Sequence, residues 1–161
     1  MLLAVFSDSH GNARRMAAAV ARYRPDCVIF LGDGVGDAER VRAAHPEIRF
    51  IILRGNCDPA GAADADALLT LGGVPIFAAH GHDHAVRYGL DKFCTSVWCS
   101  GAKLGLYGHT HVPRWEEIRG MQIMNPGSIG SAQHPTFGLI RLEGGTADCR
   151  ILDAPEGDTT K

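Results

Sequence analysis

The sequence has no long hydrophobic run, no excess of one charge and no recognisable secretory leader. Its apolar stretches are all far shorter than the roughly 20 residues that a membrane-spanning helix needs. Residues 2–6 are apolar but too few for the core of a signal peptide. Sixteen basic and 18 acidic side chains leave a net charge of −2, without the basic surface typical of nucleic-acid or lipid binding. We therefore expect a cytoplasmic protein with no membrane partner and no clear nucleic-acid surface.

A cysteine pattern that would indicate disulfides or a zinc site is also missing. The five cysteines make an odd number with no Cys-x-x-Cys spacing, which favours reduced thiols. A length of 161 residues is typical of one domain. We predict a single domain over residues 1–154 and a frayed polar tail over residues 155–161. The oligomeric state is left open, a homo-oligomer included.

What the chain does contain is an alternation of strand-like and helix-like segments. Apolar runs over residues 2–7, 27–31 and 48–53 alternate with helical segments over residues 13–23 and 37–44, the first capped by Asn12 or Gly11. This order predicts βαβ units and a parallel sheet. Downstream, the pattern predicts a helix over residues 88–100 and strands over residues 68–71, 74–79, 103–107, 114–118, 121–124, 136–142 and 147–152.

Polar side chains follow these apolar runs at five places. The segments are Asp8-Ser9-His10, Gly32-Asp33, Gly55-Asn56, His80-Gly81-His82 and Gly108-His109-Thr110-His111. Ligands of open α/β sheets bind at the carboxyl edge of the strands, so the repetition favours one shared site. Residues two apart in an extended backbone point the same way, which predicts that His109 and His111 aim at one point. Taken singly, each motif also fits exposed loop residues.

The residue types in these segments favour a site for two metal ions. Two carboxylates, one amide and four imidazoles are too many ligands for one tetrahedral zinc ion, but they suit two ions that share a carboxylate. A set of nitrogen and oxygen donors without thiolate favours Mn, Fe, Zn, Ni or Co. Two such ions, about 3.5–4 Å apart, can clamp a phosphate and generate a hydroxide nucleophile at neutral pH.

In their order along the chain, these motifs resemble those of the calcineurin-like metallophosphoesterase superfamily. The short length, Gly55-Asn56-Cys57-Asp58 and Asn125-Pro126-Gly127-Ser128 resemble its small prokaryotic one-domain phosphodiesterases, the YfcE-like branch. The resemblance implies the α/β class and a metallo-dependent phosphatase-like fold. In that fold, two mixed β-sheets flanked by helices form a four-layer α/β/β/α sandwich.

The resemblance also implies ligands for two divalent ions, with Mn favoured and Ni, Zn, Fe, Co or Mg as alternatives. Position by position, the ligands are Asp8, His10, Asp33, Asn56, His80, His109 and His111. Asp8, His10 and His111 would hold the first ion, and Asp33 would bridge to the second. Asn56 would also contact the phosphate, and His80 rather than His82 matches the family position. No other cofactor site is implied.

One departure from the family pattern bears on catalysis. Many relatives have a histidine after the asparagine as general acid, whereas this chain has Cys57. Cysteine has an ordinary pKa of about 8.5 and suits that role less well at neutral pH. We expect metal-assisted departure of the leaving group, or a contribution from His82 or His84. The expected function is a phosphodiesterase acting on a small phosphate ester. The alternatives are a phosphomonoesterase, or a non-catalytic protein-interaction module similar to the retromer-subunit branch.

Overall fold

The computed structural model describes residues 1–156, and its strands form two five-stranded sheets. The first sheet has the order β10-β9-β1-β2-β3. Its parallel part consists of β1 (Leu2–Phe6), β2 (Cys27–Phe30) and β3 (Arg49–Ile52). The hairpin of β9 (Thr136–Glu143) and β10 (Thr146–Asp153) adds to it through an antiparallel pairing with β1. The predicted parallel sheet is thus part of a mixed one.

The second sheet is also mixed and has the order β4-β5-β6-β8-β7. Its parallel centre consists of β5 (Val74–Ala79), β6 (Leu104–Leu106) and β8 (Met121–Asn125). The antiparallel edge strands are β4 (Asp66–Leu71) and β7 (Arg114–Ile118). Each strand lies within a few residues of its predicted position, because glycine turns and apolar alternation mark both ends.

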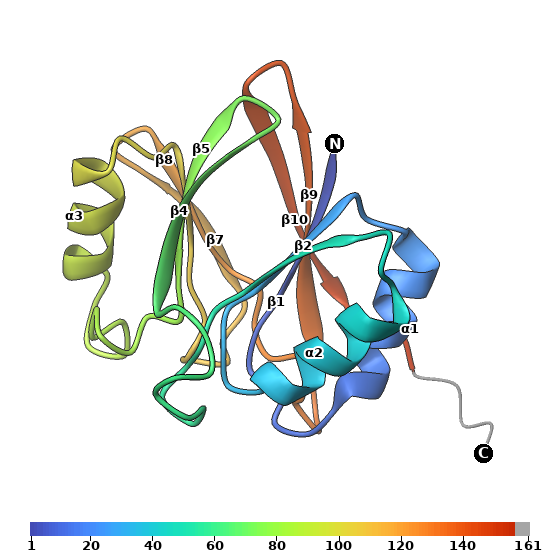
Figure 1. The fold of residues 1–161 in the computed structure, drawn as a ribbon. Coiled ribbons are helices and arrows are strands. Elements are labelled where there is room, and N and C mark those ends of the chain that lie inside the picture. The colour runs from blue at the N-terminus through green and yellow to red at the C-terminus, as the bar shows by residue number, and fades with distance from the viewer. Residues whose placement is uncertain (157–161) are drawn as a thin grey trace.

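Helices cover the outer faces of the two stacked sheets (Figure 1). Helices α1 (Ala13–Tyr23) and α2 (Val35–Ala44) lie on the first sheet, and α3 (Asp91–Cys99) lies on the second. The layers therefore run helix, sheet, sheet, helix. This is the four-layer α/β/β/α sandwich that the family resemblance implied, and the predicted fold class is confirmed.

Three apolar clusters hold these layers together. Strand β1 shows why: Leu3 and Val5 point into the cluster between the sheets, while Ala4 and Phe6 point into the cluster under α1 and α2. A third cluster, which includes Phe93, lies between the second sheet and α3. Strands buried on both faces have continuous apolar sequences, so the apolar runs of the central strands follow from this layering.

Some helix ends differ from the predictions. Helix α2 begins at Val35 rather than Asp37, and α3 is shorter than predicted because Gly89 (φ +152°) and Gly101 (φ +73°) flank it. Asn12 precedes α1 as predicted but makes no side-chain capping hydrogen bond. Within the part of the chain that the structure describes, no helix is long and apolar enough to cross a membrane. Of the predicted tail, residues 157–161 lie outside the described residues.

Candidate metal centre

The predicted ligands lie in the loops that follow β1, β2, β3, β5 and β6. These loops begin at the carboxyl ends of their strands, where open α/β sheets bind their ligands. Several of these ligands have a left-handed backbone conformation. The φ angles are +55° at Asp8, +44° at His10, +60° at Asp33, +67° at His109 and +61° at His111. This conformation is costly for residues with a Cβ atom, and such strain clusters at functional sites.

The backbone at His109 and His111 corrects one prediction. We expected an extended segment that aims both imidazoles at one point, but β6 already ends at Leu106 and both histidines have positive φ. Their rings consequently join different groups of candidate ligands. The prediction was wrong because the chain turns at Gly108, and the period of two applies only to extended backbone.

The first group consists of Asp8, His10 and His111. His111 Nε2 lies 3.2 Å from Asp8 Oδ1 and 3.3 Å from His10 Nε2. Asp8 is fully buried, yet its Oδ1 atom has no hydrogen-bond partner among the described residues. A buried oxygen without a donor is costly. The two imidazoles beside it make a divalent cation a fitting partner for this oxygen.

The second group consists of Asp33, His80 and His109, all of them buried. His80 Nε2 lies 3.5 Å from Asp33 Oδ2 and 3.2 Å from Asn56 Oδ1, which adds the predicted amide to the group. The other ring nitrogen of His80, Nδ1, lies 2.8 Å from the carbonyl oxygen of Leu31. Histidines that bind metals usually donate their second nitrogen to such an oxygen, which leaves Nε2 free as a ligand.

Asp33 links the two groups. Its carboxylate oxygen lies within 4.8 Å of ligand atoms of His10, from the first group, and of Cys57. Asp33 Oδ1 also accepts a hydrogen bond from the backbone N–H of Cys57 at 2.8 Å. The structure thus brings all the predicted ligands together at one edge of the sandwich, namely Asp8, His10, Asp33, Asn56, His80, His109 and His111.

Two glycines allow the loops of the second group to touch. A Cβ atom at Gly32 would lie 2.4 Å from the backbone nitrogen of Gly55, and one at Gly55 would collide with Asp33. Gly32 also has a φ of +104°. Only glycine allows two backbones to approach so closely, and this approach brings Asp33 and Asn56 to the same site.

Charges within the centre shift the pKa values of its ionisable groups. Burial raises the pKa of Asp33, but hydrogen bonds from His80 and from the backbone of Cys57 outweigh it, and the net pKa is well below the ordinary range. Burial lowers the pKa of His80, but the neighbouring Asp33 carboxylate outweighs this effect, and the net pKa is raised. The nearby carboxylate of Asp8 raises the pKa of His111, whereas burial and the charge of His80 lower the pKa of His109 to about 4.

The sequence analysis missed residues that hold the ligand loops. Asn125 Nδ2 donates to the carbonyl of Gly108 and to Thr110 Oγ1, and Ser128 Oγ donates to the carbonyl of Asp8. From the sequence, the segment Asn125-Pro126-Gly127-Ser128 served only as part of the family resemblance. Asn125 and Ser128 are buried, and buried polar side chains usually form hydrogen bonds. The two polar residues in this segment were therefore the only sequence signal of its supporting role.

Of the two histidines expected to help the leaving group depart, His82 lies at the rim of the centre, whereas the ring of His84 packs edge-on against Phe77 and Phe93. His82 is exposed, and its ring centroid lies 5.3 Å from that of His109 at an interplanar angle of 78°. Cys57 is exposed as well, and the nearby carboxylate of Asp33 raises the pKa of its thiol. A thiol with a raised pKa keeps its proton more firmly, so this shift makes Cys57 a poorer proton donor.

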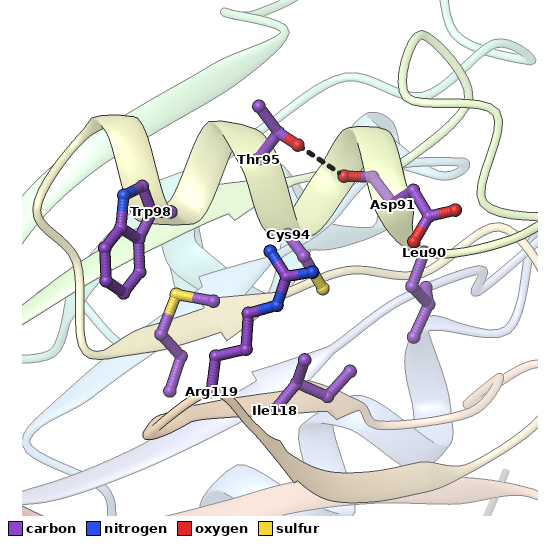
Figure 2. A pocket seen from close by; sticks show the side chains of 8 residues that line it. Leu90, Asp91, Cys94, Thr95, Trp98, Ile118 and Arg119 are labelled. Atoms are coloured by element: carbon purple, nitrogen blue, oxygen red, sulfur yellow. Dashed lines mark hydrogen bonds between the residues drawn. The ribbon is translucent and has the colours of Figure 1, made fainter.

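A separate groove of about 550 Å³ lies between α3 and the β7–β8 hairpin. Figure 2 shows Cys94 and Trp98 of α3 on one side, and Ile118 and Arg119 on the other. The residues that line it include no predicted ligand. It adjoins Met121 at the start of β8, whereas Asn125 at the other end of that strand belongs to the candidate centre.

Comparison with known proteins places the chain in a family. The family model of the calcineurin-like phosphoesterase superfamily domain matches residues 1–145. The chain therefore belongs to the calcineurin-like phosphoesterase superfamily, as its motifs predicted. Membership supports a hydrolase that uses divalent metal, since the candidate ligands are the histidines and carboxylates such enzymes employ.

Individual relatives agree with this assignment. The chain is 29% identical over 157 residues to the probable metallophosphoesterase YsnB of Bacillus subtilis (strain 168), covering 95% of this chain and 91% of that one. A novel archaeal phosphodiesterase of known structure is 21% identical, with a TM-score of 0.71 over 94% of this chain and 100% of that one. Wild-type Vps29 of Entamoeba histolytica, complexed with Zn²⁺, is 18% identical, with a TM-score of 0.75 over 95% and 99%. At these identities the two structures show the fold alone.

Proposed function

We propose that the chain is a phosphodiesterase that hydrolyses a small phosphate ester with two divalent metal ions, its residues 1–154 acting as one domain. The observation that carries the proposal is the convergence of ligands from five loops into two groups joined by Asp33. Family membership and the name of the archaeal neighbour support a phosphoesterase and a diester substrate. Manganese is the metal that the family resemblance favours, and mixed imidazole and carboxylate ligands can bind it, as they can Fe, Zn, Ni or Co.

The proposed ligands divide between two ions. Asp8, His10 and His111 would hold the first ion, Asn56, His80 and His109 would hold the second, and Asp33 would serve both. Bound there, the ions would supply Lewis acidity toward the phosphate and lower the pKa of water toward neutrality. Asp33 and Asp8 offset the positive charge, and the neutral amide of Asn56 preserves Lewis acidity. His80 stays oriented through Leu31.

In this proposal, His82 donates a proton to the leaving group or contacts the substrate. Its position supports the role, because it is exposed beside His109, where a bound ester would be accessible. Cys57 replaces the family histidine, and the Asp33 carboxylate raises the pKa of its thiol, which makes it a poorer proton donor. We expect esters with good leaving groups to react faster, since their departure requires less protonation.

The central experiment combines metal analysis with a substrate panel. The purified protein is stripped of metal and reloaded with Mn, Ni, Zn or Mg, and its rates on bis(p-nitrophenyl) phosphate and p-nitrophenyl phosphate are compared. We expect about two ions per chain, turnover only with metal, and preference for the diester. His10→Ala should lower the rate, whereas the matched variant His134→Ala, at an exposed histidine outside the centre, should not.

The same panel separates the alternatives. A preference for the monoester would indicate a phosphomonoesterase. Metal binding without turnover on any ester would favour a protein-interaction module on the same fold, which the likeness to Vps29 leaves open because it shows the fold alone. Absence of metal binding would contradict the proposal altogether.

The role of His82 is tested with phenyl esters of graded leaving-group pKa. If His82 donates the proton, His82→Ala should slow esters of poor leaving groups about 10²-fold or more and leave the best ones nearly unchanged. The steeper dependence on leaving-group pKa is the diagnostic result. An unchanged slope, with chemistry rate-limiting, would remove His82 from this role.

A further inference from the structure

Two further carboxylates hold the strained ligand loops in place without being ligands themselves. Asp58 accepts hydrogen bonds from four backbone N–H groups on two segments. Asp37 accepts one from a hydroxyl and one from a backbone N–H on a third segment. Neither residue belongs to a group of candidate ligands in the described part of the chain. Each contacts the loop of a different group.

Asp58 joins the loop after β2 to the loop after β3. Its Oδ2 accepts from Asp33 N at 2.7 Å and from Gly55 N at 2.8 Å, and its Oδ1 accepts from Gly34 N at 3.0 Å and Val35 N at 2.9 Å. Four donors occupy both oxygens, so no lone pair is well placed for a metal. The carboxylate instead connects the segment of the bridging Asp33 to the segment of Asn56.

Asp37 holds the loop after β1 through hydrogen bonds in the same way. This buried carboxylate accepts, at Oδ2 alone, a hydrogen bond from Ser9 Oγ at 2.7 Å and one from Gly11 N at 2.8 Å. The loop has positive φ angles at Asp8, His10 and Gly11, a conformation that persists only when the surroundings hold it. Asp37 supplies those contacts from the first turn of α2.

We propose that Asp58 and Asp37 are positioning residues, each of which preorganises one metal subsite. Asp58 sets the second subsite, of Asp33, Asn56, His80 and His109, and Asp37 sets the first, of Asp8, His10 and His111. The inference rests on the proposed function, since it assumes that these groups bind metal. Charge-assisted hydrogen bonds to backbone N–H groups are strong enough to hold strained loops, and such support governs metal affinity.

The hydrogen-bond patterns predict opposite responses to asparagine. An amide has one acceptor oxygen, so Asp58→Asn must leave two of the four N–H groups facing an NH₂ group. At position 37 both bonds go to the same oxygen, so Asp37→Asn can keep both. Asp37→Ala removes them. A residue that served only as a source of negative charge would respond alike at both positions.

The test is calorimetric titration of the metal-free protein with Mn²⁺, with His10→Ala and His80→Ala identifying the binding step of each subsite. We expect Asp58→Asn to weaken the second subsite about 10–100-fold and the first by a smaller factor, because the bridging Asp33 would serve both. Asp37→Ala should weaken the first subsite by a similar factor, and Asp37→Asn should resemble the wild type. Asp58→Glu, which keeps both oxygens, should lose less than Asp58→Asn.

Asp26→Asn is the matched control. Asp26 Oδ2 accepts a hydrogen bond from Leu2 N at 2.6 Å across a similar separation in sequence, but away from the centre. An amide can keep this single bond, so the variant should fold and keep both subsites at wild-type affinity. A folded Asp58→Asn protein with unchanged affinities would overturn the inference, as would equal weakening of both subsites. If Asp58→Asn does not fold, unchanged affinities in Asp58→Glu would overturn it.

These outcomes are distinct from failure of the proposed function. A wild-type protein that binds no Mn²⁺ would contradict the metal centre and the inference together. A wild-type protein that binds two ions, with Asp58 and Asp37 variants that bind them equally well, would contradict the inference alone.

Discussion

The two groups of candidate ligands differ most in their exposure to solvent. In the first group, the side chains of His10 and His111 are 39% and 43% exposed, and only Asp8 is buried. In the second group, the side chains of Asp33 and His80 are each 4% exposed. In the first group, Asp8 and His10 follow β1 and His111 follows β6. In the second, Asp33 lies where the loops after β2 and β3 touch through glycine.

This difference in exposure predicts different metal affinities at the two subsites. Buried ligands with fixed partners, such as His80 on the carbonyl of Leu31, are preorganised and should bind an ion tightly. Exposed imidazoles keep more side-chain freedom, so closing them around an ion costs conformational entropy. We expect the second subsite to retain its ion more firmly, and the first to exchange with solvent and adjoin the substrate.

The largest expected effect follows from the residue that joins the subsites. Asp33→Asn removes the charge that would bridge two cations, so turnover should fall about 10³-fold or more, equivalent to several kcal/mol of transition-state stabilisation. Steady-state rates on a diester check this, with circular dichroism to verify folding. Normal activity in a folded variant would exclude a bridging role for Asp33.

A smaller effect is expected on metal binding when one histidine ligand is removed from either subsite. His80→Ala should weaken Mn²⁺ binding at the second subsite about 10–100-fold, whereas His10→Ala should weaken the first subsite by a smaller factor, since a flexible exposed ligand contributes less. Metal content after dialysis against a weak chelator measures both. If the His10 variant loses more metal than the His80 variant, the order of the two subsites is reversed.

The smallest expected effect is a dependence on pH. The raised pKa values of His80 and His111 mean that protons compete with metal there, whereas His109, with a pKa of about 4, is neutral and ready to bind. The proton on His80 stabilises the metal-free fold below the unfolded pKa, and this contribution is lost as pH rises through the folded pKa. Mn²⁺ affinity should therefore rise between pH 6 and 8, by about tenfold or less at each subsite.

The increase in Tm on adding Mn²⁺ is the measurement for this pH dependence, taken at pH 6, 7 and 8. It should grow with pH in the wild type and in His134→Ala, a variant at an exposed histidine outside the centre. A Tm increase of the same size at all three pH values would show that no proton leaves the ligands in this range.

Much of the architecture was predictable because it depends on local rules. The apolar run of Leu2–Phe6 and its equivalents predict strands buried on both faces, and the glycine turns predict the hairpins. The candidate ligands were predictable for a related reason. Parallel strands end at one edge, so side chains that follow them, such as Asp8 and His80, converge without any long-range information.

Tertiary structure decided the backbone conformation and the support of these side chains, whereas their grouping had been implied only by the family resemblance. His109 and His111 are neighbours in sequence, yet their rings separate because a left-handed turn, stable only against the packed loops around it, directs them to different partners. Asp58, Asp37 and Asn125 hold loops through hydrogen bonds to backbone groups. Every residue has such backbone groups, so these contacts cannot be recognised from the sequence. The sequence determines which ligands exist, and the packing of the two sheets determines which of them meet.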